Sequence, residues 1–242
     1  MSARDGSKSV PFKNSLPCAS RHVPMFLSNL KAAVDTPSIS EVYTFSDIPI
    51  VESFADMYGY KTIKRPNYMN GDTQSHYSVM KYAVDYIIEE HPDVDSFVLL
   101  LGNNCGCDVG DLTKAVDALK FDTHASAVMS VGVFNQFNPY RAFAQKDESY
   151  IETVVPQAQI PDSKSNEKDV LDKVYFFNGS FWIVRKNVFL SNSGIKPYTW
   201  LGSKVRHFEQ SSYIQEIDDW WQYHLVTQFK NEDYIKGIDR HS

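Results

Sequence analysis

Short apolar runs alternate with amphipathic helical patterns through the first half of this sequence, and that alternation restricts the possible folds more than any other feature. Residues 96–101 (SFVLLL) form a continuous apolar run, which is typical of a strand buried on both faces. Helical patterns lie before and after it, at residues 75–90 and 111–119, and a second apolar run follows at residues 125–134. This order predicts a three-layer α/β sandwich in which a mostly parallel sheet has helices on both faces.

Weaker patterns predict the remaining elements. Helices are expected at residues 21–34, 49–58 and 218–229, and short strands at residues 41–45, 61–63 and 203–209. Residues 174–184 carry Asn178-Gly179 between aromatic residues, which indicates a hairpin or else a bulge within one strand. We expect residues 1–242 to form one domain, in which residues 135–200 include a hairpin or insertion that binds an acceptor or makes a homodimer contact.

Charge and composition exclude several classes of protein. Lys and Arg total 24 against 30 Asp and Glu, and the formal net charge of −6 argues against general binding of nucleic acid or of an anionic membrane. No apolar run is long enough for a transmembrane helix, and the first residues lack the apolar core of a secretory signal, so a cytoplasmic protein is expected. Cys105 and Cys107 have no further ligands at zinc-like spacing, and three cysteines make no disulfide framework.

Basic residues surround a Gly-Ser turn near the start of the sequence. Arg4, Lys8 and Lys13 lie around Gly6-Ser7, and such a turn exposes consecutive backbone N–H groups that can surround phosphate oxygens. Arginine offers phosphate a planar pair of donors, and lysine offers a point charge. These residues predict a polyanion site within an acidic protein; a solvated basic tail is the alternative.

Four segments, in order along the chain, resemble the cytidylyltransferases that make CMP-activated sugar acids, the acylneuraminate type. The pattern A-R-x-G-S-K-x-x-P-x-K-N, which ends at Asn14, resembles the nucleotide-binding loop of that family. Residues 46–59 (SDIPIVESFADMYG), the pattern R-P-x4-G-D-T-x-S at residues 65–75, and residues 176–185 (FFNGSFWIVR) resemble three later segments. The resemblance covers most of the chain and implies a GT-A-like nucleotidyltransferase fold.

The resemblance also implies what the first loop does. An acceptor oxygen would attack the α-phosphorus of CTP, and pyrophosphate would leave. Such a transfer depends on charge neutralisation and positioning, so Arg4, Lys8 and Lys13 are the expected catalytic residues. The residues that match the family's nucleotide-binding loop are Ala3, Arg4, Ser7, Lys8, Lys13 and Asn14.

An acidic pair late in the sequence is the expected Mg²⁺ site. Glu216 and Asp218 lie in Q-E-I-D-D-W-W-Q, and in an extended segment residues two apart point the same way. Magnesium binds one or two carboxylates and keeps positions for phosphate oxygens. The family usually has Asp-x-Asp here, so Glu216 is a departure, and Asp219 is a competing ligand. Asp218 or Asp219 could instead cap the following helix.

Other polar residues are expected to contact the two substrates. Asp72 is predicted to bind the nucleotide's sugar or to cap a helix, and Asn103 and Asn104 to read the base or to form a turn. Arg141 is predicted to pair with an anionic group of the acceptor, with a surface arginine as the alternative. Asn178 is predicted to line the acceptor pocket with its aromatic neighbours, which could equally form core or a dimer contact.

The start of the sequence departs from the family pattern. The family has an apolar strand before the Arg-x-Gly-Ser-Lys loop, whereas here Met1, Ser2 and Ala3 precede Arg4. Either the start of the gene is misplaced, or the chain is truncated, or the sheet lacks its central strand. In the last case the neighbouring strands would have unpaired backbone groups, which is costly when they are buried.

The expected function is transfer of CMP from CTP to an acylneuraminate-like sugar acid or a similar anionic acceptor, with Mg²⁺ as cofactor. Three alternatives remain: a CTP:phosphonate-type cytidylyltransferase, a catalytically impaired nucleotide-binding homologue, and a GT-A glycosyltransferase that uses a preformed nucleotide sugar.

Overall fold

The computed structural model describes residues 1–18, 23–71, 74–104, 106–160, 171–210 and 216–228. The helices are α1 (Met25–Val34), α2 (Pro49–Ser53), α3 (Ala55–Tyr58), α4 (His76–Glu90), α5 (Val109–Phe121), α6 (Lys186–Ser191) and α7 (Trp220–Gln228). The strands are β1 (Ser2–Ala3), β2 (Pro17–Cys18), β3 (Val23–Pro24), β4 (Tyr43–Ser46), β5 (Lys61–Lys64), β6 (Ser96–Leu100), β7 (Ala127–Val133), β8 (Phe143–Gln145), β9 (Ile151–Thr153), β10 (Tyr175–Arg185) and β11 (Val205–Glu209). Within these ranges, no helix has both the length and the apolar character needed to cross a membrane.

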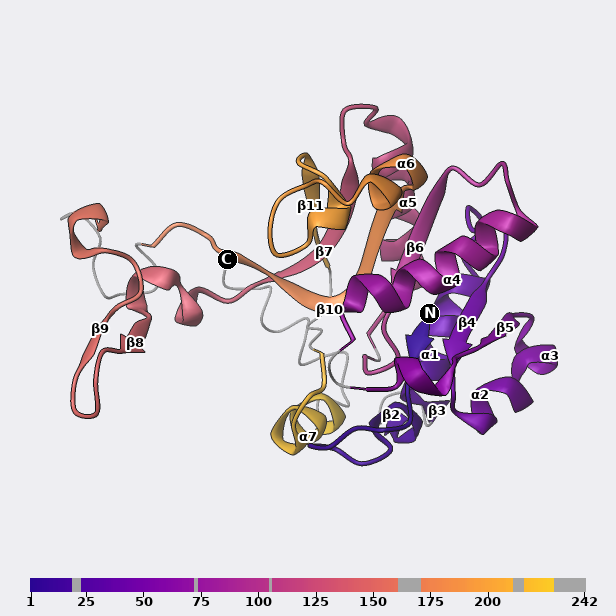
Figure 1. Ribbon diagram of the computed structural model, residues 1–242, viewed down its shortest axis with the longest axis horizontal. Coiled ribbons are helices and arrows are strands. Elements are labelled where there is room, and N and C mark those ends of the chain that lie inside the picture. Colours follow the sequence, from indigo (N-terminus) through magenta and orange to yellow (C-terminus); the bar gives the residue numbers. More distant parts are fainter. Residues whose placement is uncertain (19–22, 72–73, 105, 161–170, 211–215, 229–242) are drawn as a thin grey trace.

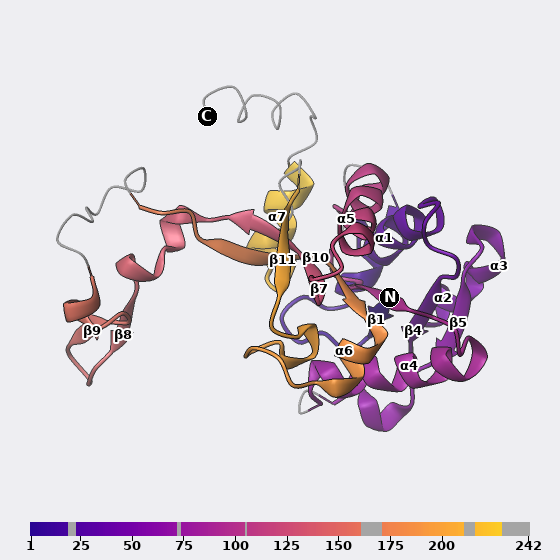
Figure 2. The ribbon, with the colours of Figure 1, turned by 90° about the horizontal axis from the view of Figure 1, so that it is seen from above.

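Helices cover both faces of the central strands, which confirms the predicted α/β sandwich (Figures 1 and 2). On one face, Ala33 of α1 and Leu112 of α5 pack against Leu100 and Ile183. On the other face, α4 and α6 pack against alternate residues of the same strands, including Leu99. The alternating in-and-out pattern of β6 thus places one layer of helices on each side.

Seven of the described strands form two sheets that meet at one point. β1, β4 and β5 are parallel neighbours in that order, and β11, β7, β10 and β6 form the second sheet. β10 runs antiparallel to both β6 and β7, whereas β11 is parallel to β7. A single parallel bridge, between Ser2 and Leu101, joins the two sheets. Within these two sheets, β10 is therefore the one strand that runs antiparallel to its neighbours.

The first strand is short. β1 pairs Ser2 and Ala3 with Phe45 and Ser46 of β4. The backbone N–H of Gly102 donates to the carbonyl oxygen of Ser2 at 3.0 Å, which ties the end of β6 to the same two residues. A cavity of about 430 Å³ continues from Met1 between β4 and β6.

The Asn178-Gly179 pair lies in a bulge, so the hairpin interpretation of this dipeptide is wrong and the bulge interpretation is confirmed. β10 is one strand, and its register against β7 shifts between Phe177 and Trp182. Gly179 has φ = +84°, a conformation that favours glycine. The first residues of β10 and the end of β7 leave the body together and continue into a projecting arm that carries the β8–β9 hairpin (Figure 1).

Local signals set the ends of the helices. The Ser75 hydroxyl accepts a hydrogen bond from the N–H of Ser78 at the start of α4, and Asp108 caps α5 in the same way. Gly59 ends α3 with φ = +71°. The helix predicted at residues 21–34 begins only at Met25, because Pro24 before it has an extended backbone.

Candidate functional site

A cleft of about 250 Å³ opens where β1, β5 and β6 end, at the edge of the sheet where α/β folds bind ligands. The strand ends supply Arg4, Arg65 and Asn103, and the segment before α7 supplies Glu216 and Asp218. The predicted site residues that line the cleft are Ala3, Arg4, Lys13, Asn14, Asn103, Glu216 and Asp218. The cleft thus contains predicted residues from both ends of the chain.

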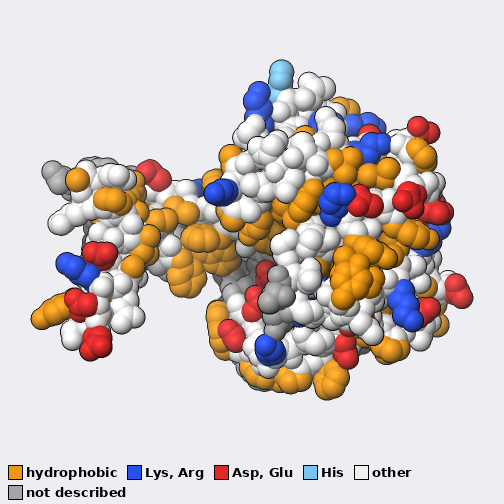
Figure 3. Space-filling view, in the orientation of Figure 1, with side chains coloured by type: hydrophobic (Ala, Val, Ile, Leu, Met, Phe, Trp, Pro, Cys, Tyr) orange, Lys and Arg blue, Asp and Glu red, His pale blue; other side chains and the backbone are white. Residues whose placement is uncertain are grey.

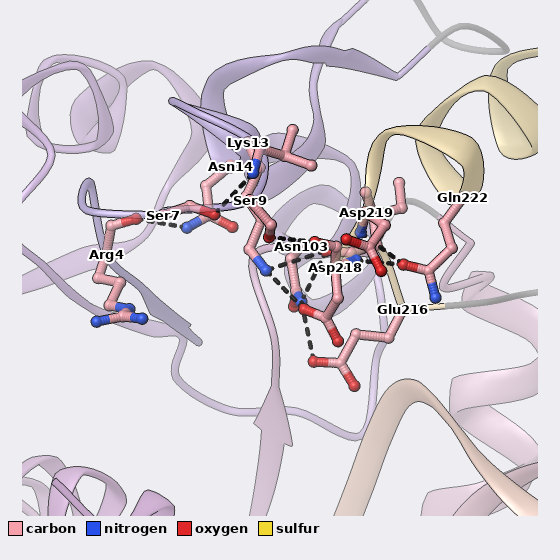
Figure 4. Close-up of polar contacts among 12 residues, drawn as sticks. Arg4, Ser7, Ser9, Lys13, Asn14, Asn103, Glu216, Asp218, Asp219 and Gln222 are labelled. Atoms are coloured by element: carbon pink, nitrogen blue, oxygen red, sulfur yellow. Dashed lines mark hydrogen bonds and ion pairs between the residues drawn. The ribbon is translucent and has the colours of Figure 1, made fainter. Parts of the chain in front are cut away.

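Lys13 connects the first loop to the acidic segment (Figure 4). Its Nζ lies 2.7 Å from Oδ1 of Asp218 and 3.0 Å from the carbonyl oxygen of Ile217. The Ser9 hydroxyl also donates to the backbone carbonyl of Asp218. A positive charge from the basic loop therefore lies directly on the predicted metal site.

The Asn103 amide lies between the two acids. Its Nδ2 is 2.9 Å from Oε1 of Glu216 and 3.4 Å from Oδ1 of Asp218. Ile217, the residue between the acids, is fully buried beside Met25. The alternation predicted for this segment is confirmed, because two carboxylates reach one amide while the residue between them enters the core.

Glu216 is the more buried acid of the pair. Burial raises its pKa above the ordinary range, and the charge of Asp218 adds to this, whereas the Asn103 hydrogen bond and the charge of Lys13 act in the opposite direction. A Cβ on Gly179 would lie 2.6 Å from Cβ of Glu216. The bulge in β10 therefore gives Glu216 the room to reach the cleft.

The two carboxylates suit a magnesium ion. Their oxygens converge on one Asn103 nitrogen, and the Lys13 ammonium shows that a positive group is stable beside Asp218. The described residues contain no group of three or more His, Cys, Asp or Glu side chains that could hold a metal. Two protein ligands would leave the other positions of Mg²⁺ to phosphate and water, as this ion prefers. Asp219 does not line the cleft, and its backbone N–H donates to Oε1 of Gln222.

Asn14 offers the cleft an unused acceptor. Its Nδ2 donates to the carbonyl oxygen of Arg4 at 2.7 Å, and the side chain is only 4 % exposed. Its Oδ1 is buried without a hydrogen-bond partner. Since a buried acceptor is normally paired, an N–H or O–H of a ligand in the cleft is the fitting partner.

Arg65 is a cleft residue to which the sequence analysis gave no role. Its Nη2 donates to the carbonyl oxygen of Met69 at 2.6 Å, while its Nε is buried without a partner. Burial lowers the pKa of this guanidinium, the charge of Asp47 opposes that change, and the charge of nearby Arg4 adds to it. The signal was present in the motif at residues 65–75, whose arginine could have been read as a second cation for the phosphates.

His76 borders the same cleft, next to the rings of Trp182 and Trp200. The His76 side chain is exposed to solvent, and its ring also lies close to protein atoms on the cleft wall. Burial and the charge of Arg65 lower its pKa to about 4. The lowered pKa favours the neutral imidazole, which can accept a hydrogen bond from a ligand.

Asn104 and Asn178, which were predicted to contact the substrates, form hydrogen bonds with other protein groups. Nδ2 of Asn104 donates to the carbonyl oxygen of Asn178, and Oδ1 of Asn104 accepts from the N–H of Gly106. The Asn178 amide accepts from the Ser130 hydroxyl and donates to Oε1 of Gln210. Both side chains hold the bulge and the loop after β6, and neither lines the cleft.

The remaining predicted residues lie farther out. Lys8 is exposed on the first loop, and the Ser7 hydroxyl accepts from the N–H of Val10 at 3.4 Å. Arg141 is exposed on the arm and is not part of this cleft. Asp72 lies outside the described residues.

Comparison with solved structures identifies the fold. The chain is similar to a CMP:2-keto-3-deoxy-manno-octonic acid synthetase complexed with CTP, with 16 % identity over 94 % of this chain and 95 % of that one, and a TM-score of 0.63. It is also similar to a 4-diphosphocytidyl-2C-methyl-D-erythritol synthase from Anaerococcus prevotii, with 9 % identity over 86 % of each chain and a TM-score of 0.58.

A putative glucose-1-phosphate thymidylyltransferase from Bacillus anthracis matches at 15 % identity over 91 % of this chain and 87 % of that one, with a TM-score of 0.56. No model of a protein family matches the sequence. The chain therefore has the GT-A-like fold of nucleotidyltransferases, as the sequence resemblance implies.

Proposed function

We propose that this protein is a Mg²⁺-dependent cytidylyltransferase that moves CMP from CTP to an acylneuraminate-like sugar acid or a similar anionic acceptor. One observation carries the proposal: Lys13 of the first loop meets Asp218 and, through Asn103, Glu216 in a single cleft. A cation for phosphate and a carboxylate pair for a metal are the groups that phosphoryl transfer requires. The likeness to a synthetase complexed with CTP supports the choice of nucleotide.

In this proposal, different cleft residues contact different parts of the nucleotide. Arg4 and Lys13 neutralise the triphosphate, with Ser7 and Lys8 at its outer end. Asn14 uses its unpaired Oδ1 to accept a hydrogen bond from the nucleoside. Magnesium, held by Glu216 and Asp218, supplies charge neutralisation and orientation of the phosphates when it is bound.

In the proposed reaction an acceptor oxygen forms a bond to the α-phosphorus, and the bond from that phosphorus to the bridging oxygen of the β-phosphate breaks. Where the acceptor oxygen is a hydroxyl, its proton passes to solvent water. The electron pair leaves with pyrophosphate, whose growing charge Lys13 and Arg4 stabilise. Such electrostatic stabilisation acts most strongly in a cleft with little water. No residue of the chain needs to form a covalent intermediate.

The arm suits a second copy of the chain. Figure 3 shows hydrophobic side chains (orange) along it, and the exposed large apolar residues there are Phe137, Phe143, Tyr150, Ile151 and Val154. Arg141 lies on this arm and not in the cleft of its own chain. Sedimentation that detects only monomer at micromolar concentration would remove the homodimer from the proposal.

Pyrophosphate release tests the activity. The protein is incubated with CTP, Mg²⁺ and a panel of sugar acids and phosphonates, and Asp218→Asn serves as the matched inactive variant. Release that needs Mg²⁺, CTP and an acceptor supports the proposal, and the best acceptor separates sugar acids from phosphonates. CTP binding without turnover and without a Mg²⁺ requirement would instead indicate a nucleotide-binding homologue. Transfer from a preformed nucleotide sugar, with none from CTP, would indicate a glycosyltransferase.

A further inference from the structure

Gln222 of α7 reaches back over the start of its own helix toward the acidic segment (Figure 4). Its Oε1 accepts a hydrogen bond of 2.7 Å from the backbone N–H of Asp219 and another of 2.7 Å from that of Asp218. The spacing Asp219-x-x-Gln222 is that of a capping box, in which a Glu or Gln three residues along accepts from the N–H of the capping residue. Capping of α7 therefore accounts for the bond from Asp219.

The bond from Asp218 is not part of a capping box. Asp218 lies one residue before the capping position, outside the helix, and its side chain lines the cleft. The backbone carbonyl of Asp218 also has a side-chain partner, because the Ser9 hydroxyl donates to it. Both backbone polar groups of Asp218 are thus held by side chains, one from α7 and one from the first loop.

The residue before Asp218 is fixed as well. The N–H of Ile217 donates to the carbonyl oxygen of Asn103 at 3.0 Å. The carbonyl oxygen of Ile217 accepts from Nζ of Lys13 at 3.0 Å, and the Ile217 side chain is fully buried. These contacts come from the first loop and from the loop after β6, whereas Gln222 holds the segment from the side of α7.

Asp218 needs such support because its own side chain is 58 % exposed, so packing does little to direct its carboxylate. Backbone torsion angles decide which rotamers a side chain can adopt. Fixed peptide groups on both sides of Asp218 therefore favour the rotamer that brings Oδ1 within 3.4 Å of the Asn103 amide, beside Glu216. Hydrogen bonds that support a metal ligand in this way commonly change metal affinity about 10–100-fold.

We propose that Gln222 is a positioning residue that holds the carboxylate of Asp218 beside that of Glu216 for a magnesium ion. The inference rests on the proposed function, since it takes these two acids to be the metal-binding pair. Gln222 does not line the cleft, so it acts through the backbone of Asp218 and not by touching the nucleotide.

CTP binding tests the proposal without an acceptor and therefore without turnover. Gln222→Met keeps the length of the side chain but removes its oxygen acceptor, and Gln222→Glu keeps the acceptor. Asp108→Ala is the matched control, because Oδ1 of Asp108 likewise accepts from two backbone N–H groups, at the start of α5, and Asp108 does not line the cleft. Calorimetry measures the Kd for CTP with Mg²⁺ and with EDTA, and thermal unfolding measures stability.

Gln222→Met should lose about tenfold of the gain in CTP affinity that Mg²⁺ gives, while its CTP affinity in EDTA stays unchanged. A merely structural role would weaken CTP binding alike in both conditions. Gln222→Glu should keep the gain, since its Oε1 still accepts from both N–H groups. Asp108→Ala should also keep the gain, although its Tm should fall as that of Gln222→Met does, because each loses a helix cap.

A double variant shows whether Gln222 acts through Asp218. When Asp218→Asn is already present, adding Gln222→Met should change CTP affinity in Mg²⁺ by less than about twofold, because the carboxylate to be positioned is gone. Additive losses would overturn the proposal, and so would equal losses of affinity with Mg²⁺ and with EDTA in Gln222→Met.

The unchanged protein separates the two ways of failing. A gain with Mg²⁺ that Asp218→Asn removes and Gln222→Met keeps in full would overturn this inference alone. No gain with Mg²⁺ in the unchanged protein would overturn the proposed function together with it.

Discussion

Nζ of Lys13 and Oδ1 of Asp218 lie 2.7 Å apart, although 205 positions separate the two residues in the sequence. The Lys13 side chain is 16 % exposed and that of Asp218 is 58 % exposed, so water screens the pair. An exposed ion pair contributes at most about 1 kcal/mol to stability. The contact therefore matters chiefly because it places charges of both signs where a triphosphate and its metal would meet.

Lys13→Met is expected to lower kcat/KM for pyrophosphate release about 100-fold or more, because a phosphate cation is lost. Its free energy of unfolding should fall by no more than about 1 kcal/mol, because the pair is exposed. Lys61→Met is the control, since Lys61 makes a 3.0 Å surface ion pair with Glu41 outside the cleft. Steady-state kinetics and urea unfolding measure both variants, and an equal loss of activity in the control would contradict the role of Lys13.

Asp218→Asn and Asp219→Asn separate the two candidates for the metal site. Asp218 lines the cleft beside Asn103, whereas Asp219 does not line it. Asp218→Asn should lose about 100-fold or more of the Mg²⁺-dependent activity and need a higher Mg²⁺ concentration. Asp219→Asn should remain within about threefold of the unchanged protein. A magnesium titration of activity checks this, and the reverse order of effects would assign the ligand to Asp219.

Glu216→Gln is expected to change the stability of the protein in a pH-dependent way. The folded state raises the pKa of Glu216 above its ordinary value of 4.5, chiefly by burial, so the folded state keeps a proton that the unfolded state has already lost. Stability contributed at this site therefore falls as pH rises above 4.5, until Glu216 is ionised in the folded state as well.

Without ligands, Glu216→Gln should consequently unfold at a higher temperature than the unchanged protein at pH 7, and the difference should shrink as the pH is lowered through that window. Adding CTP with Mg²⁺ should reverse the order, since only the carboxylate form gains stability from the bound metal. Thermal unfolding at several pH values checks the sign. A difference that grows as the pH falls would show that Glu216 is not the group responsible.

Gly179→Ala is expected to impair both folding and activity. The residue has φ = +84°, which costs a side-chain-bearing residue about 1–2 kcal/mol, and a Cβ there would press on Glu216. Gly59→Ala is a matched control, because φ is +71° but the nearest neighbouring atom lies 4.0 Å from the added carbon. Both variants should lose stability by urea unfolding, while only Gly179→Ala should also lose Mg²⁺-dependent activity. Equal activities would mean that the bulge does not position Glu216.

The fold could be predicted from the sequence because its strongest signals are local. Residues 96–101 read as a buried strand, and the structure has β6 at Ser96–Leu100 with helices on both faces. The antiparallel direction of β10 could not be predicted, since strand direction depends on which strands pair and not on the local pattern. The same limit left the Asn178-Gly179 dipeptide undecided between a turn and a bulge.

Residues of the cleft could be predicted where the residue type and its spacing along the chain indicated the same role. The family resemblance, together with charge and a two-residue alternation, led us to expect Lys13, Glu216 and Asp218 in the site, and the structure brings them together. Asn178 has the residue type of a binding group, yet the hydroxyl of Ser130 and the side chain of Gln210 occupy its amide. Arg65 shows the opposite case, because its motif carried a signal but its burial in the cleft became visible only in the tertiary structure.

β10 enters the body from the arm at Tyr175 and reaches the bulge at Gly179, against which Glu216 packs. One continuous strand thus runs from the projecting arm to the residue against which this acidic side chain packs.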